Sequence, residues 1–248
     1  MTDPNQSEHG QTLIEHLSEL KDRLVRAVWA IAVGTAVCWF FNEQLFEVLR
    51  RPILETKLLN GLVFTHPTDN FMAHIKVAVL GGVVLTCPFW LYQVWQFIVP
   101  GLYEDERRYS MIFIAAGSVL FVIGISFAYF LVLPSALHFL LGFGGGAEKP
   151  MITIKEYFSF FTSMMLVFGF AFELPLVIVV LGAMGVVNQT FLREKRRIMI
   201  VVLAVISAIV TPPDAASMLM LLVPLVLLYE ISIYLVGLLG DRKKSATP

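Results

Sequence analysis

A run of 23 apolar residues without a charge, residues 111–133, constrains this chain more than any other feature of its sequence. A helix needs about 20 apolar residues to cross the hydrocarbon core of a bilayer, so this run predicts a membrane-spanning helix. Residues 77–99 and 157–187 meet the same requirement. Of 248 residues, 57% are hydrophobic and only 15% are charged, which excludes a soluble domain with an ordinary polar surface.

Three weaker apolar runs complete the predicted set of spans. Residues 24–41 can cross if Arg26 extends its guanidinium to the interface. Residues 198–210 would reach only about 20 Å as a helix, and residues 215–239 are interrupted by Glu230. We therefore expect an all-α, polytopic membrane protein with six transmembrane helices, the last two of them short. A re-entrant pair in place of the last two spans is the alternative.

Prolines shape the expected architecture of these spans. Pro88, Pro175 and Pro224 each lie inside a run, where the missing backbone donor can kink the helix. Kinked helices of unequal length favour a curved, concave wall over a straight bundle. After the first span, a short amphipathic helix is expected to end at Pro52. The sequence shows no internal repeat, so we expect a single integral membrane domain.

Lysine and arginine predict the orientation, because they are enriched in cytoplasmic segments. Residues 1–26, 100–110, 188–197 and 240–248 would share one side of the membrane and hold twelve of them, whereas the opposite side holds six. Both termini are therefore expected in the cytoplasm, with an amphipathic helix at residues 12–23 and a basic tail at the other end. The acidic N-terminus argues against a cleavable signal peptide.

A first group of carboxylates lies just before the first span. Glu15, Glu19 and Asp22 share one face of the predicted N-terminal helix. They could receive a cationic partner at the membrane surface. They could equally form a solvated face that is balanced by Lys21 and Arg23.

A second group is the run Glu104, Asp105 and Glu106, in the short loop before the third span. Carboxylates bind guanidinium groups bidentately, so this loop could also hold an arginine of a partner. The alternative is that these acids stabilise the positive end of the helix that follows. The residues alone leave both interpretations open.

Glu173 is a lone carboxylate near the middle of the fourth run. A carboxylate at that depth costs on the order of 2–4 kcal/mol or more, and such residues mark ion pathways or polar contacts between helices. A protonated glutamic acid that is hydrogen-bonded within the bundle is the alternative.

Several classes of function find no support in the sequence. There is no zinc-protease motif, nucleophile elbow or phosphate-binding loop. Cys38 and Cys87 lie in apolar runs, which favours buried thiols over a disulfide or a metal site. No basic stripe indicates nucleic acid. We therefore expect no catalytic residue, no metal, no other cofactor and no enzymatic activity.

Five sequence blocks, in order along nearly the whole chain, resemble those of one family. They are His16-Leu17-Ser18-Glu19-Leu20-Lys21-Asp22-Arg23-Leu24, the stretch from Pro88 to Arg108 with Tyr92-Gln93-Val94-Trp95-Gln96-Phe97, Phe127-Ala128-Tyr129-Phe130, Phe168-Gly169-Phe170-Ala171-Phe172-Glu173-Leu174-Pro175, and Thr211-Pro212-Pro213-Asp214. Together they resemble the TatC family, the signal-recognition subunit of the twin-arginine protein translocase.

The resemblance implies a function as well as a fold. A TatC-like protein would be the signal-peptide receptor and core scaffold of a translocase that exports folded proteins, driven by the proton-motive force. It would lie in the bacterial inner membrane and bind the paired arginines of precursor proteins at the cytoplasmic face. Its partners would be TatA-like and TatB-like single-span proteins in a multimeric complex, together with membrane lipid.

The resemblance also implies roles for single residues. By position in these motifs, the signal-peptide site would comprise Glu19, Lys21, Phe97, Glu104, Asp105 and Glu106. Glu173 would be an intramembrane polar contact for a partner, and Pro52 and Asp214 would serve assembly at the outer face. The family often has arginine where this chain has Lys21, which keeps the charge but loses the planar fork. A secondary transporter that uses Glu173 as a coupling site is the competing hypothesis, although such proteins commonly show internal repeats.

Overall fold

The computed structural model describes residues 4–55, 62–98, 110–142, 151–211 and 215–245. Within these ranges the chain is almost entirely helical, and extended backbone pairs only in a bridge between Val63 and Thr153. The elements are α1 (Pro4–Phe40), α2 (Asn42–Glu55), α3 (Pro67–Leu85), α4 (Cys87–Ile98), α6 (Ser110–Phe127), the π-helix η2 (Ala128–Val132), α7 (Leu133–Gly142), α8 (Ile154–Ala171), α9 (Leu174–Ala183), α10 (Gln189–Glu194), α11 (Arg196–Val210) and α12 (Ala215–Ser245).

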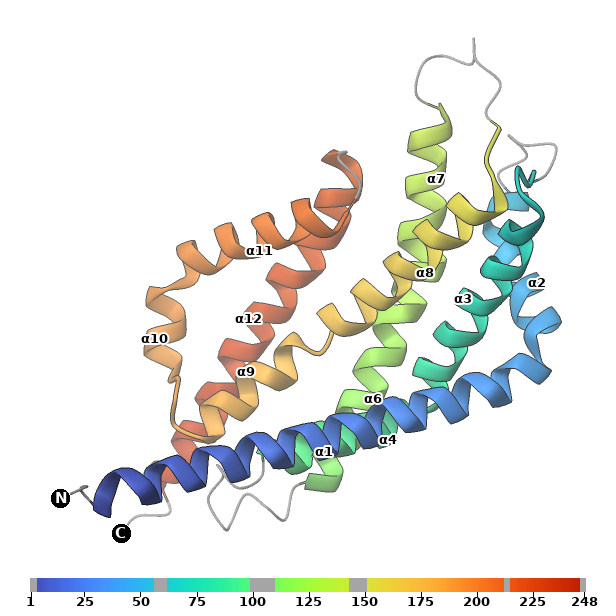
Figure 1. The fold of residues 1–248 in the computed structure, drawn as a ribbon. Helices are drawn as coiled ribbons and strands as arrows, with labels where there is room; N and C mark the ends of the chain where they lie inside the picture. The colour runs from blue at the N-terminus through green and yellow to red at the C-terminus, as the bar shows by residue number, and fades with distance from the viewer. Residues whose placement is uncertain (1–3, 56–61, 99–109, 143–150, 212–214, 246–248) are drawn as a thin grey trace.

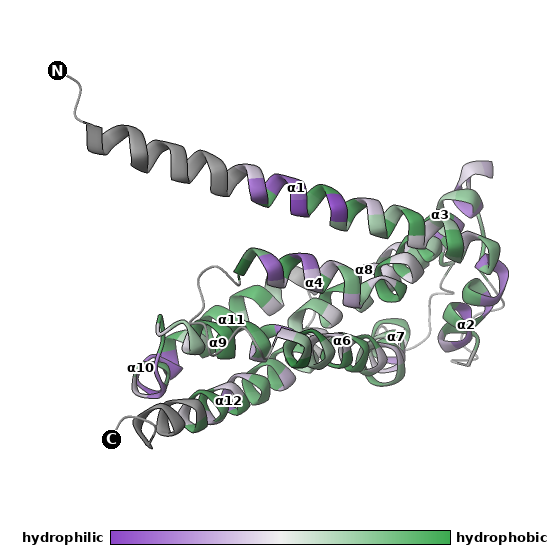
Figure 2. Ribbon diagram, turned by 90° about the horizontal axis from the view of Figure 1, so that it is seen from below, coloured by the Kyte–Doolittle hydropathy of each residue, from purple (hydrophilic) through white to green (hydrophobic). Residues whose placement is uncertain are grey.

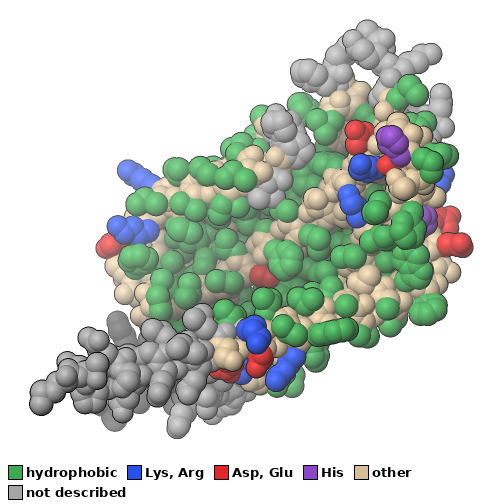
Figure 3. All heavy atoms as spheres, viewed as in Figure 1, with side chains coloured by type: hydrophobic (Ala, Val, Ile, Leu, Met, Phe, Trp, Pro, Cys, Tyr) green, Lys and Arg blue, Asp and Glu red, His purple; other side chains and the backbone are tan. Residues whose placement is uncertain are grey.

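The helices lie side by side in a curved wall (Figure 1). α1 packs against α3 and α4, α8 packs between α3 and α6, and α9 packs against α12, which also contacts α11. Figure 2 shows that α1 diverges from the layer that holds α9, α10 and α12. In Figure 3, apolar side chains cover most of the visible face and charged side chains gather toward its edges. The predicted all-α fold and concave wall are confirmed.

Five helical stretches among the described residues are long and apolar enough to cross a membrane. They are Ser18–Phe40, Pro67–Leu85, Ser110–Gly142, Ile154–Ala183 and Ser217–Leu238. Several bounds differ from the expected ones, because helices continue beyond the apolar runs. The second stretch begins at Pro67 rather than at residue 77 and ends at the α3–α4 break, and the third continues to Gly142.

The last two predicted spans differ from each other. α11 has 15 residues and would be about 22 Å long, shorter than the roughly 30 Å hydrocarbon core. The expectation of a short fifth helix is confirmed, whereas its crossing of the membrane stays a prediction, because α11 is not among the five stretches above. The expectation of a short sixth span is wrong, because α12 is one helix of 31 residues. Glu230 does not interrupt it, since its carboxylate pairs with the Arg196 guanidinium of α11 at 2.7 Å.

Prolines divide two of the predicted spans into pairs of helices. Pro88 follows the break between α3 and α4 at Thr86, whose hydroxyl donates to the Gly82 carbonyl oxygen at 2.7 Å. Pro175 lies in the first turn of α9, directly after the break that ends α8. Pro224 lies inside the continuous α12. The break before Pro175 positions the candidate functional residue Glu173.

The expectation that Pro52 ends its helix is wrong, because α2 continues to Glu55. Proline has no N–H for the carbonyl four residues earlier, which belongs to Val48. The Tyr129 hydroxyl donates to that oxygen at 2.8 Å, and the Tyr157 hydroxyl donates to the Leu49 oxygen at 2.8 Å. These two bonds fix the buried Pro52 turn of α2 against η2 and α8.

Aromatic side chains form much of the core between α6 and α8. Phe121, Phe158, Phe161 and Phe168 are fully buried. The two helices approach closely at Gly124, where an added Cβ would lie 2.5 Å from the Phe168 carbonyl oxygen. This tight contact fixes the end of α8, and with it the turn at residues 172–173.

Candidate functional site

A polar cluster joins α1 to α4 at the beginning of the first candidate span, Ser18–Phe40. The Arg23 guanidinium donates to Glu19 Oε1 from Nε at 3.0 Å and also from Nη2. Its Nη1 donates to Gln96 Oε1 at 3.3 Å, and Gln96 Nε2 donates to the Tyr92 hydroxyl at 2.7 Å. We call Glu19, Arg23, Tyr92 and Gln96 the α1–α4 cluster.

The α1–α4 cluster is partly accessible. The Glu19 side chain is 39% exposed, whereas that of Arg23 is 18% exposed. Lys21 is not part of it: its side chain is 75% exposed and lies 3.9 Å from Asp22. The Glu19 carboxylate therefore accepts two hydrogen bonds from one guanidinium, and part of its surface remains accessible to solvent.

A groove of about 650 Å³ opens beside the same stretch of α4. Its walls are mainly apolar side chains of α4, α6 and α9, including Trp95, Phe113 and Val180. Trp95 stacks on Phe113, with ring centroids 4.6 Å apart. Phe97, a predicted signal-peptide residue, also lines the groove.

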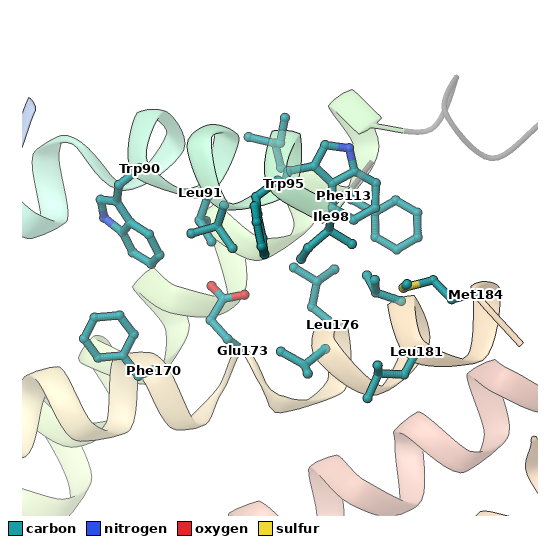
Figure 4. Close-up of a pocket in the computed structure, with 15 residues that line it drawn as sticks. Trp90, Leu91, Trp95, Ile98, Phe113, Phe170, Glu173, Leu176, Leu181 and Met184 are labelled. Atoms are coloured by element: carbon teal, nitrogen blue, oxygen red, sulfur yellow. The ribbon is translucent and has the colours of Figure 1, made fainter. Parts of the chain in front are cut away.

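Glu173 reaches this groove from the turn between α8 and α9 (Figure 4). Figure 4 shows its carboxylate directed toward Leu91 and Trp95 of α4. The residue is 8% exposed, and neither carboxylate oxygen has a hydrogen-bond partner. α6 leaves room for the carboxylate at Gly117, where an added Cβ would lie 3.1 Å from Glu173 Oε2.

A buried carboxylate without a partner is a strongly unfavourable arrangement in an isolated chain. The Trp95 indole nitrogen, which also lies in the groove wall, has no partner either. The groove therefore combines a large apolar surface with an unpartnered acceptor and an unpartnered donor. Such a site is suited to an apolar helix that carries a polar side chain.

The cluster and the groove meet on α4, because Gln96 belongs to the cluster and Phe97 to the groove wall. Glu104, Asp105, Glu106 and Asp214 lie outside the described residues. Pro52 is buried in the turn of α2 that Tyr129 and Tyr157 hold, and it belongs to neither the cluster nor the groove wall. Groups of three or more metal-ligating residues are absent from the part of the chain that the structure describes.

Sequence reasoning missed part of both sites. The i,i+4 spacing of Glu19 and Arg23 was a usable signal for their ion pair. The contact of Arg23 with Gln96 depends on how α1 crosses α4, which no local pattern encodes. Trp90 and Trp95 are buried, although tryptophans near the end of an apolar run commonly lie at the membrane interface.

Comparison with known proteins decides the family. Residues 15–224 match the family described as Sec-independent protein translocase protein (TatC). The chain belongs to the TatC family. It is similar to TatC of Desulforapulum autotrophicum, with 38% identity over 97% of this chain and 90% of that protein, and to TatC of Aquifex aeolicus, with 39% identity over 94% and 97%.

Solved structures of the family agree with the fold. A crystal structure of the twin-arginine translocase receptor TatC aligns with a TM-score of 0.78 at 38% identity, over 89% of this chain and 97% of that chain. A second TatC crystal structure, in the detergent DDM, gives a TM-score of 0.80 at 38% identity, over 90% and 99%. The family resemblance seen in the sequence is confirmed, and it places this multi-pass membrane protein in Sec-independent protein translocation. It also decides against the competing secondary transporter.

Proposed function

We propose that this chain is the receptor for twin-arginine signal peptides and the core scaffold of its translocase. The observation that carries the proposal is the two-donor contact of a guanidinium with Glu19. A signal-peptide arginine would bind the same carboxylate in the same way. The open surface of Glu19 gives it access.

The second arginine of the signal would bind Glu106, with Glu104 and Asp105 adding negative charge. The loop that carries these acids is attached to Ile98, two residues after Gln96, and to Ser110 at the start of α6. Because each of the two carboxylates would bind one arginine, a signal peptide would need both arginines to fill the site. Lysine would keep the charge but lose the planar fork that matches a carboxylate, so the site would discriminate against it.

The groove would hold the membrane helix of a TatA-like or TatB-like partner. An apolar helix covers the walls formed by α4, α6 and α9, and a polar side chain on it donates to Glu173. Such a partner would resolve the unfavourable burial of the carboxylate. Pro52 and Asp214 would serve assembly at the opposite face.

The remaining parts of the proposal concern the setting. The chain would lie in the bacterial inner membrane with both termini cytoplasmic, take part in a multimeric complex, and use the proton-motive force rather than an enzymatic reaction. The charge distribution supports this orientation. A cysteine placed at Ser245 should resist impermeant thiol reagents added outside intact cells, whereas labelling there from outside would contradict the orientation.

The receptor proposal is tested by measuring the affinity of the full chain, in detergent, for a twin-arginine signal peptide. Glu19→Lys should reduce binding below detection, because it places a cation where the peptide's guanidinium must lie. Asp22→Lys makes the same charge change in the same helix and should reduce binding only slightly. Equal loss in both variants would show a nonspecific charge effect and contradict the proposed site.

A further inference from the structure

Two adjoining polar pockets lie far from the groove, where α1 ends, α2 turns back and α3 begins. Their volumes are about 410 and 420 Å³, and both are lined by Glu43 and His74. Neither has a part in the proposed receptor or partner site. We call the first, which also includes Trp39 and Asn42, the amine pocket, and the second, which includes Arg50 and Arg51, the arginine pocket.

Asn42 gives the amine pocket a chemical preference. The residue is 7% exposed, lines the pocket, and its Oδ1 has no hydrogen-bond partner. Buried acceptors are nearly always paired, so this oxygen indicates a missing N–H or O–H donor. The neighbouring Glu43 carboxylate, which forms no ion pair among the described residues, favours a donor with positive charge.

Aromatic rings complete a site for an ammonium group. Trp39 and Phe71 both line the amine pocket, with ring centroids 6.1 Å apart and planes at 75°. Two aromatic walls at a steep angle, together with a carboxylate, are the usual surroundings of a recognised ammonium ion. His74 is held in place by its stack on Phe46, with centroids 4.2 Å apart.

The arginine pocket supplies guanidinium groups, from Arg50 and Arg51, beside the carboxylates of Glu43 and Glu47. Arg50 and Arg51 are exposed and make no ion pair or side-chain hydrogen bond with the residues that the structure describes. Guanidinium groups of this kind bind phosphate. Because Glu43 and His74 line both pockets, an ammonium site and a phosphate site lie next to each other.

The depth of the two pockets points to a lipid. One candidate span ends at Phe40, directly after Trp39, and another begins at Pro67, which lines the amine pocket. The site therefore lies where the chain leaves the hydrocarbon core, at the level of lipid headgroups, where tryptophan is enriched. A molecule that carries an ammonium and a phosphate a few bonds apart at that depth is a zwitterionic phospholipid.

We propose that this site binds the headgroup of a phosphatidylethanolamine, with its ammonium in the amine pocket and its phosphate in the arginine pocket. The primary ammonium donates to Asn42 Oδ1 and pairs with Glu43. Phosphatidylcholine fits the same charges, but its quaternary ammonium has no N–H for Asn42. The site therefore distinguishes the two lipids through a single acceptor atom.

The test is lipid retention by the full chain in detergent, measured by native mass spectrometry with lipids of matched acyl chains. The wild type should bind phosphatidylethanolamine about tenfold more tightly than phosphatidylcholine, as one charge-assisted hydrogen bond predicts. Phosphatidylglycerol, which has no ammonium, should bind more weakly than both. Equal binding of all three lipids would overturn the proposal.

Substitutions of the pocket residues test each proposed contact with the lipid headgroup separately. Asn42→Leu should remove the preference over phosphatidylcholine without lowering thermal stability, because the acceptor that it removes is unpaired. Glu43→Gln should weaken both zwitterionic lipids, and the double variant Arg50→Gln with Arg51→Gln should weaken all three. Glu156→Gln removes an exposed carboxylate from the N-terminal turn of α8 and serves as the control, which should bind like the wild type.

A soluble headgroup distinguishes a lipid from a free solute. Glycerophosphoethanolamine should compete for the site only weakly, because it gains nothing from the membrane. If it competes as well as the lipid, or if Asn42→Leu retains the lipid preference, the pocket does not recognise a membrane phosphatidylethanolamine and the proposal is wrong.

Discussion

Two carboxylates of this chain, Glu19 and Glu173, have opposite surroundings. Glu19 lies in the half-exposed α1–α4 cluster and accepts two donors from Arg23. Glu173 is buried in an apolar groove and accepts none. The first is stable alone and can exchange one guanidinium for another, whereas the second needs a donor from outside the described chain. The difference suggests reversible recognition at Glu19 and assembly at Glu173.

The largest expected effect comes from removing the unpartnered carboxylate. Glu173→Leu should lower the rate of export of a folded twin-arginine substrate at least tenfold, because the groove loses its polar contact for a partner helix. Thermal unfolding of the purified chain should stay the same or shift upward, since an unsatisfied buried group costs about 1–3 kcal/mol. An unchanged export rate would show that Glu173 is only a packing residue.

The next prediction concerns a substitution that removes the donor from a carbonyl oxygen that is hydrogen-bonded in the native structure. Tyr129→Phe leaves the Val48 carbonyl oxygen, four residues before Pro52, without its donor. Because this hydrogen bond is exposed to solvent, we expect unfolding in detergent to be easier by about 0.5–1.5 kcal/mol, the net contribution of an ordinary hydrogen bond. Tyr234→Phe is the control, because Tyr234 is exposed and its hydroxyl makes no hydrogen bond with the described residues. Equal effects in the two variants would contradict the role given to Tyr129.

Salt should separate the two carboxylates further. The affinity for a twin-arginine peptide should fall as ionic strength rises, because Glu19 is partly exposed and its charge is screened. Association of a partner helix with the purified chain should change much less, because Glu173 is buried. Parallel titrations with sodium chloride measure both. A stronger salt effect on the partner helix would reverse the comparison.

The smallest effect is expected for a satisfied pair that is open to solvent. Arg196 and Glu230 join α11 to α12, and their side chains are 47% and 38% exposed. Arg196→Ala should therefore lower the stability of the chain by less than about 1 kcal/mol. A loss of several kcal/mol would show that the pair fixes the short helix α11 in place.

Local composition predicted most of the fold, because lipid solvation demands long apolar helices. The same reasoning failed where a distant contact compensates a local disruption. Pro52 does not end α2, because Tyr129 donates to the carbonyl that proline leaves unpaired. Glu230 does not interrupt α12, because glutamate is a good helix former and its charge is half-exposed and paired with Arg196 of α11.

The candidate sites divide in the same way. Glu19 and Glu173 were recognisable as unusual carboxylates at the edge and in the middle of apolar runs. Their surroundings were not, since the groove is made by α4, α6 and α9 together and the cluster by the crossing of α1 and α4. Such contacts depend on where helices break and at what angle they cross, and the hydrophobic pattern of the sequence does not determine either.

The central claim, that Glu19 binds a signal-peptide guanidinium directly, is tested by a double-mutant cycle between the chain and the peptide. The four affinities are those of the wild type and Glu19→Gln for a twin-arginine peptide and for its twin-glutamine counterpart, which has no cation. Direct pairing predicts a coupling energy of at least about 1.5 kcal/mol, the contribution of a hydrogen bond to a charged group. If the two changes are simply additive, the guanidinium lies elsewhere and the account of Glu19 is wrong.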